Sequence, residues 1–208
     1  MSSLAVTQRR PDLQLPEAQV ITLRGVSWQR FQTIAQSFAD VGSVRLTFID
    51  GLLEIMSPIG PLHERLKSTL CLLLETYLRE KGIRFYVKGG FTLAVAGRAA
   101  GEPDASYCLN RDKPVPDIVL EVIVTSGSLD KRALYLPLGV PELWFWQSGQ
   151  LTLFELQGEG ARRRYAQVNR SRLLPDLPVE WLSEYMDCAD QYDAVQAFQA
   201  RLRSDAAD

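Results

Sequence analysis

The sequence predicts an α/β or α+β fold, in which helices lie on the faces of a β-sheet. The first observation is the segment PDIVLEVIVT, residues 116–125, because so unbroken a run of apolar and β-branched residues is typical of a central strand covered on both faces. The second is the alternating pattern around Asp50-Gly51, a strong hairpin signal. The third is a helical pattern from Pro61 to about Lys81, whose apolar middle indicates a helix packed between layers.

The other N-terminal elements follow from caps and turn residues. Residues 27–39 are predicted to form a helix, because Ser27 is a good N-cap and apolar side chains recur behind it at helical spacing. Residues 44–57 contain the hairpin, and Gly82 is placed to end the long helix. Residues 96–103 are expected to be a loop that leads into a short strand.

The second half of the chain alternates strands with short helices. A turn and a short helix are expected over residues 126–138, with Ser128 as the cap and Lys131 in the first turns. Two helical segments are expected after a loop at residues 171–178, and the last of them carries an apolar stripe. Strands are expected at residues 84–88, 91–95, 104–109, 116–125, 141–147, 150–156 and 162–168.

Length and composition bound the class of protein. With 208 residues, we expect one domain over residues 20–208, preceded by a flexible N-terminal arm, residues 1–19. No apolar run suits a membrane span, and three cysteines without paired spacing indicate reduced thiols in a cytoplasmic protein. His63 is the only histidine, which excludes most mononuclear zinc hydrolases. A net charge of −2 neither argues for a nucleic-acid partner nor excludes one.

One charged residue interrupts the apolar central strand. Glu121 lies in the middle of PDIVLEVIVT, and an unpaired carboxylate buried there would be strongly unfavourable. We therefore expect a cationic or hydrogen-bonding partner for it. That partner is either a structural arginine or lysine, or a metal ion.

Two further carboxylates are candidates to join Glu121: Asp104, at the start of a short strand, and Glu64, in the first turn of the long helix. If the strands of Asp104 and Glu121 pair, their carboxylates converge, and a divalent cation would relieve the repulsion between them. Oxygen ligands of this kind suit Mg²⁺ or Mn²⁺, and the carbonyl of Val122 is a natural additional ligand. Such an ion activates water for attack on a phosphoryl group, and a nearby lysine would position that water.

Each of these residues also has a plainer explanation. An aspartate that follows a proline, as Asp104 does, is often a turn residue. Glu64, in a first helical turn, is favourable for the helix dipole alone. Glu121 itself needs no more than a buried cationic partner.

The same residues carry a resemblance to a known family. Pro103-Asp104, followed by Glu121 in an apolar strand and preceded by Glu64 on a helix, resembles the PD-(D/E)XK restriction-endonuclease-like superfamily. More narrowly, the ordered strings FIDGLLEIMSP, PLHERL, GEPDASY, PDIVLEVIVTSGSLDK and LGVPELWFW, with a weaker SRLLPDL, resemble the Uma family of endonucleases. The resemblance implies a restriction-endonuclease-like central mixed sheet flanked by helices. It also implies hydrolysis of DNA with Mg²⁺ (or Mn²⁺) as cofactor.

The chain departs from the superfamily pattern at the catalytic lysine. That lysine should follow Glu121 by two residues, but Ile123 stands there. We expect its role to pass to Lys131 on the following helix, with Lys88 on a neighbouring strand as the other candidate. If neither reaches the site, the alternative is a catalytically impaired nucleic-acid-binding or scaffold protein that keeps the nuclease fold. A third possibility is a structural or partner-binding domain whose carboxylates pair with arginines.

The last helix suggests an oligomeric state. Its apolar stripe consists of Tyr192, Val195, Phe198 and Leu202. A stripe of this kind on a terminal helix predicts a homodimer.

Overall fold

The strands form two sheets in the computed structural model, which describes residues 19–57, 60–89, 92–124 and 129–205. The first sheet has the order β1-β3-β2-β6-β5, with β1 (Gln19–Arg24), β2 (Arg45–Ile49), β3 (Leu52–Ser57), β5 (Leu93–Val95) and β6 (Ala99–Gly101). The second has the order β11-β10-β9-β8-β7-β4, with β4 (Phe85–Val87), β7 (Ala105–Leu109), β8 (Ile118–Ile123), β9 (Glu142–Gln147), β10 (Gln150–Gln157) and β11 (Arg164–Val168).

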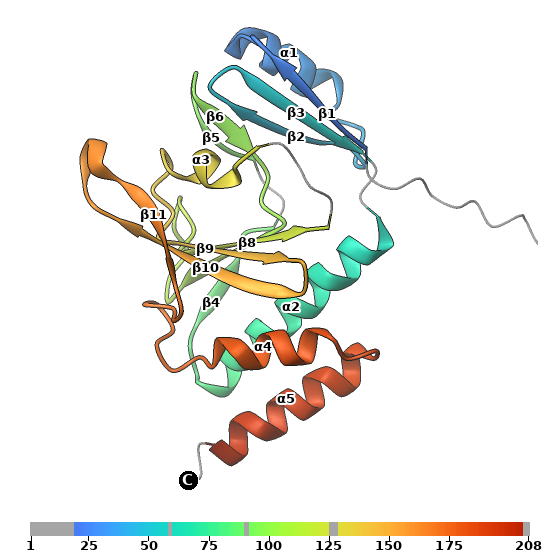
Figure 1. Ribbon diagram of the computed structural model, residues 1–208, viewed down its shortest axis with the longest axis vertical. Coiled ribbons are helices and arrows are strands. Elements are labelled where there is room, and N and C mark those ends of the chain that lie inside the picture. Colours follow the sequence, from blue (N-terminus) through green and yellow to red (C-terminus); the bar gives the residue numbers. More distant parts are fainter. Residues whose placement is uncertain (1–18, 58–59, 90–91, 125–128, 206–208) are drawn as a thin grey trace, which may run out of the picture.

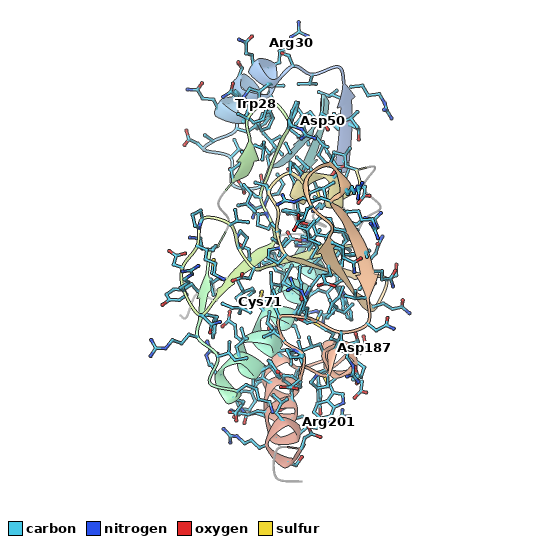
Figure 2. All side chains as sticks on the ribbon, turned by 90° about the vertical axis from the view of Figure 1, so that its left-hand side faces the viewer. Trp28, Arg30, Asp50, Cys71, Asp187 and Arg201 are labelled. Carbon is cyan, nitrogen blue, oxygen red and sulfur yellow. The ribbon has the colours of Figure 1, made fainter. Side chains whose placement is uncertain are left out.

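Most helices cover the outer faces of these sheets, and one short helix lies between the two sheets. They are α1 (Trp28–Ser37), α2 (Pro61–Glu80), α3 (Lys131–Tyr135), α4 (Val179–Met186) and α5 (Gln191–Asp205), with a 3₁₀ turn at Gly160–Arg162. Figure 1 shows α1 outside the first sheet, α3 between the sheets, and α2, α4 and α5 beyond the second sheet. Figure 2 shows the same order from the side, with Trp28 of α1 at one end, Cys71 of α2 nearer the middle and Arg201 of α5 at the other end. The predicted α/β (α+β) class is confirmed.

The first sheet confirms one prediction and corrects another. Asp50 and Gly51 turn between β2 and β3 with φ values of 42° and 87°, as the hairpin signal requires. Residues 99–101, expected to be part of a loop, instead form β6, which pairs with both β2 and β5. β1 was not anticipated either, and it pairs along β3. The hairpin therefore belongs to the first sheet, whereas the strand at residues 116–125 belongs to the second.

The apolar segment is the central strand, as predicted. β8 pairs antiparallel with β7 and parallel with β9, and α3 lies on the crossover from β8 to β9. Successive side chains of a strand point to opposite faces. Leu120 and Val122 pack in the core cluster that also contains the buried leucines of α2, while Val119 and Ile123 pack with α3 on the other face. Glu121, between Leu120 and Val122, therefore lies on the α3 face, in the layer between the two sheets.

The helices α2, α4 and α5 close the opposite face of the second sheet. α2 contacts β8, α4 and α5, so it is packed between layers as predicted. Phe198 and Leu202 of the predicted stripe are buried against this core within the chain, and Tyr192 alone of the four is largely exposed. The stripe therefore no longer argues for a homodimer, which stays a prediction without that support. None of the described helices is long and apolar enough to cross a membrane.

A second buried carboxylate ties the C-terminal segment to the sheet. Glu142 of β9 is fully buried and accepts hydrogen bonds from Trp144 Nε1 at 2.9 Å and from the Ser171 hydroxyl at 2.7 Å. It also accepts hydrogen bonds from the backbone N–H groups of Arg172 and Leu173 at 2.8 and 3.0 Å. All four donors would lose their partner if this carboxylate were removed, so its role is structural.

Glu142→Ala is therefore expected to lower the free energy of unfolding by roughly 3 kcal/mol or more, because two buried side-chain donors and two backbone N–H groups lose this acceptor. Urea denaturation followed by circular dichroism measures this. Glu155→Ala, which removes a carboxylate paired with Arg172 at 2.5 Å nearer the surface, is the matched control and should cost about 1 kcal/mol or less. Equal losses in both variants would contradict the assigned role of Glu142.

Candidate active site between the two sheets

The pairing of β7 with β8 brings two of the predicted carboxylates together. Ala105 pairs with Leu120, so Asp104 stands opposite Glu121, one step beyond the last pair of the ladder. The Asp104 carboxylate turns toward β8, where its Oδ2 accepts a hydrogen bond from the backbone N–H of Val122 at 2.7 Å. The convergence of Asp104 and Glu121 predicted from sequence is thus present.

Glu121 has a partner on each carboxylate oxygen. Its side chain is fully buried, and its Oε2 accepts a hydrogen bond from Lys131 Nζ at 2.5 Å. The hydroxyl of Tyr135 donates a hydrogen bond to Oε1. Lys131 and Tyr135 stand one helical turn apart in α3, so both side chains leave the helix on the side that faces β8. Asp130 caps this helix with its side chain, and the predicted cap, Ser128, lies outside the described residues.

Burial and the charge of the partner shift the pKa values of Glu121 and Lys131 in opposite directions. Burial raises the pKa of Glu121 to about 7; the positive charge of Lys131 opposes this rise and the negative charge of Asp104 adds to it. Burial would lower the pKa of Lys131, but the charges of Glu121 and Asp104 outweigh it and raise the pKa above its ordinary value. Lys131 therefore stays protonated, and its ammonium group is the cation that offsets both carboxylates.

His63 is a site residue that the sequence interpretation missed. Its Nε2 lies 3.1 Å from Asp104 Oδ2, and its side chain is only 11% exposed. One local signal could have indicated it: His63 directly precedes Glu64 in the first turn of the long helix. Contact with Asp104, however, depends on packing of α2 against the strands and not on any local pattern.

The pKa of Asp104 reflects these neighbours. Burial alone would raise it, but the hydrogen bond with His63, the charges of Lys131 and His63, and the Val122 N–H bond lower it to about 2. A carboxyl whose pKa is depressed in the folded state stabilises the fold above its unfolded pKa of about 4, and this stabilisation is lost as the pH falls through the folded pKa.

The stability advantage of the wild type over Asp104→Asn is accordingly expected to shrink by more than about 1 kcal/mol between pH 5 and pH 2.5. Urea denaturation at a series of pH values measures the difference. An advantage that stays constant over this range would show that the carboxylate of Asp104 is not stabilised by His63 and Lys131.

Glu64 and Lys88 do not contact Glu121. The Glu64 carboxylate is 45% exposed and pairs with Lys67 at 2.5 Å, while its Oε1 lies 3.6 Å from His63 Nδ1. Glu64 thus reaches the site only through His63. Lys88 donates a hydrogen bond to Asp112 at 2.6 Å. Of the two candidate lysines, Lys131 is therefore the one whose ammonium group contacts Glu121.

The carboxylates of Asp104 and Glu121 form a donor set that suits a hard cation. Over the described parts of the chain, no group of three or more His, Cys, Asp or Glu side chains is arranged to hold a metal ion. Asp104 and Glu121 nevertheless form a buried acidic pair. Lys131 forms an ion pair with Glu121, and its charge also lowers the pKa of Asp104. Oxygen donors of this kind fit Mg²⁺ or Mn²⁺. Ligand roles for Val122 and Glu64 stay predictions.

One more acidic residue lies near this pair. Glu54 of β3 is 4% exposed, and its charge contributes to the raised pKa of Lys131. It stands on the first sheet, so the site is lined from both sheets. The sequence interpretation did not single it out, because an acidic residue within an alternating hairpin strand has no local feature that sets it apart.

Comparison with known proteins agrees with this geometry. No curated protein matches the chain. A family model does: Uma2, described as "Putative restriction endonuclease", matches residues 28–185. The match includes α1, α2, β8 and α3, and with them every residue of the candidate site. The chain belongs to the Uma2 family.

Proposed function

We propose that this protein is a divalent-metal-dependent endonuclease that hydrolyses DNA phosphodiester bonds. The observation that carries the proposal is the contact of Lys131 with Glu121 at 2.5 Å, beside Asp104 on the neighbouring strand. Two acidic groups and a lysine are the side chains that this family's expected chemistry needs, and Lys131 supplies the lysine although Ile123 occupies the usual position.

Each residue has a definite task in this proposal. Asp104 and Glu121 would hold Mg²⁺ or Mn²⁺, with the carbonyl of Val122 and the Glu64 carboxylate as further ligands. The bound ion supplies a more acidic water and neutralises charge on the phosphoryl oxygens. Lys131 donates hydrogen bonds that orient the attacking water and stabilise the developing negative charge. His63 fixes Oδ2 of Asp104.

A pocket lies along β8 and β9 from these groups, and its lining includes none of them. The pocket, of about 450 Å³, opens at the ends of β8 and β9, and its lining includes Ile123, Leu66 and Gln147. Ile123 lies two residues beyond Glu121, and Leu66 lies one turn beyond His63 on α2.

The test is a cleavage assay on supercoiled plasmid DNA, with protein first freed of metal by a chelator. We expect nicking with Mg²⁺ or Mn²⁺ and none with EDTA. Single-stranded DNA and RNA of matched sequence show which nucleic acid is preferred. If no nucleic acid is cut with either ion at saturating protein, the endonuclease proposal is wrong.

One observation favours a second candidate function. Lys131 and Tyr135 each donate a hydrogen bond to Glu121, so side chains of the protein itself satisfy both of its oxygens. The same fold could therefore serve as a catalytically impaired nucleic-acid-binding or scaffold protein. Retention of labelled DNA in a gel-shift assay, together with no nicking under the conditions above, would favour this function.

A further inference from the structure

Tyr135 contacts Glu121 but has no part in the mechanism proposed so far. It is the last residue of α3, and its ring is fully buried in the cluster formed by Val119, Leu134 and Phe145. From there its hydroxyl donates a hydrogen bond to Oε1 of Glu121. The ring has no room to take another position, because close-packed interiors leave a buried aromatic side chain in one rotamer.

The two donors on Glu121 differ in what they allow. Lys131, on Oε2, has a flexible four-carbon chain that is 15% exposed, so its ammonium group can move to another acceptor nearby. Tyr135, on Oε1, is held by packing. Oε1 therefore has a fixed partner and Oε2 an exchangeable one.

We propose that Tyr135 is a positioning residue that anchors Oε1 of Glu121 and thereby presents Oε2, now on Lys131, to a divalent cation. The inference rests on the proposed function, because it assigns the geometry of the same metal site. Fixing a ligand before the ion arrives lowers the conformational cost of binding, and donors behind metal ligands typically contribute about 10–100-fold in affinity.

The test compares Tyr135→Phe with Tyr165→Phe by calorimetric titration of the metal-free protein with Mn²⁺. Each substitution removes one hydroxyl and keeps the ring. Tyr165 is the matched control because it is partly buried against the same cluster and donates to the Val140 carbonyl at 2.8 Å, not to a carboxylate. We expect the Mn²⁺ dissociation constant to rise about 10–100-fold for Tyr135→Phe and to change less than about threefold for Tyr165→Phe.

Unfolding temperatures with and without Mn²⁺ provide the second readout. They are measured on the same variants and show whether each is folded before titration. A purely structural role for Tyr135 would lower the metal-free unfolding temperature and leave the Mn²⁺ dissociation constant unchanged, and this result would overturn the inference alone. Absence of Mn²⁺ binding by the wild type would overturn the proposed function and the inference together.

Discussion

Glu121→Gln is expected to slow metal-dependent DNA cleavage by at least about 10³-fold, which corresponds to roughly 4 kcal/mol of transition-state stabilisation. The amide has nearly the shape of the carboxylate and can still accept the hydrogen bond from Tyr135. It lacks the negative charge, however, so Asp104 would be the one charged member of the buried pair left to hold the ion. Initial rates of plasmid nicking at saturating Mg²⁺ measure the effect.

The control for this variant is Glu75→Gln, the same chemical change on α2. Glu75 is partly buried, accepts a hydrogen bond from the Tyr107 hydroxyl at 3.2 Å and pairs with Arg79 at 2.9 Å, so it matches Glu121 in kind but is not one of the proposed ligands. It should cleave within about threefold of the wild type. If Glu121→Gln also cleaves at the wild-type rate, Glu121 is not a ligand of the catalytic ion.

Lys131→Met is expected to reduce cleavage by about 10²–10⁴-fold while Mn²⁺ still binds. Methionine keeps the length of the side chain but can neither orient water nor neutralise developing charge. Removing the ammonium group also leaves Glu121 without its counter-charge and Asp104 with His63 alone, which favours occupation by a divalent ion. Cleavage rates and Mn²⁺ titrations on the same preparation separate the two properties.

Lys113→Met provides the comparison for this second prediction. Lys113 pairs with Asp117 at 2.6 Å before the start of β8, at the opposite end of the strand from Val122 and Ile123. Its loss should leave the cleavage rate unchanged. Cleavage by Lys131→Met at the wild-type rate would show that Lys131 does not take the role of the lysine that is missing at position 123. Another residue would then have to supply that role.

Local patterns in the sequence were sufficient for the elements that depend on them. The β-branched run around Glu121 has no plausible place other than a central strand, and Asp50-Gly51 supplies the two positive φ values that a tight hairpin needs. Ser27 caps α1 as expected, accepting a hydrogen bond from the Arg30 backbone at 3.3 Å. In each case the cause lies within a few residues of the effect.

Elements that depend on distant partners were not predictable in the same way. β6 consists of Ala-Ala-Gly, which has low strand propensity, and it is extended because β2 and β5 pair with it on both sides. The contact between His63 and Asp104 joins residues 41 positions apart. Tyr135 was within reach of the sequence interpretation, since a residue four positions after Lys131 in a helix shares its face.

The position of Lys131 depends both on local spacing and on the fold. Helical spacing does not determine where its ammonium group lies. The crossover from β8 to β9, however, places α3 on the face of the sheet that carries Glu121. The lysine is therefore where the proposed chemistry needs it. Its catalytic role, like the metal-binding roles of Asp104 and Glu121, is a prediction for experiment.

Calorimetric titration with Mn²⁺ of the wild type, Asp104→Asn and Glu121→Gln tests the central claim most directly, because it needs neither the right DNA nor an active preparation. The proposed site predicts saturable binding to the wild type near neutral pH and its loss in both variants, whose folding is checked by circular dichroism. Identical binding curves for all three proteins would contradict a metal site formed by these two carboxylates.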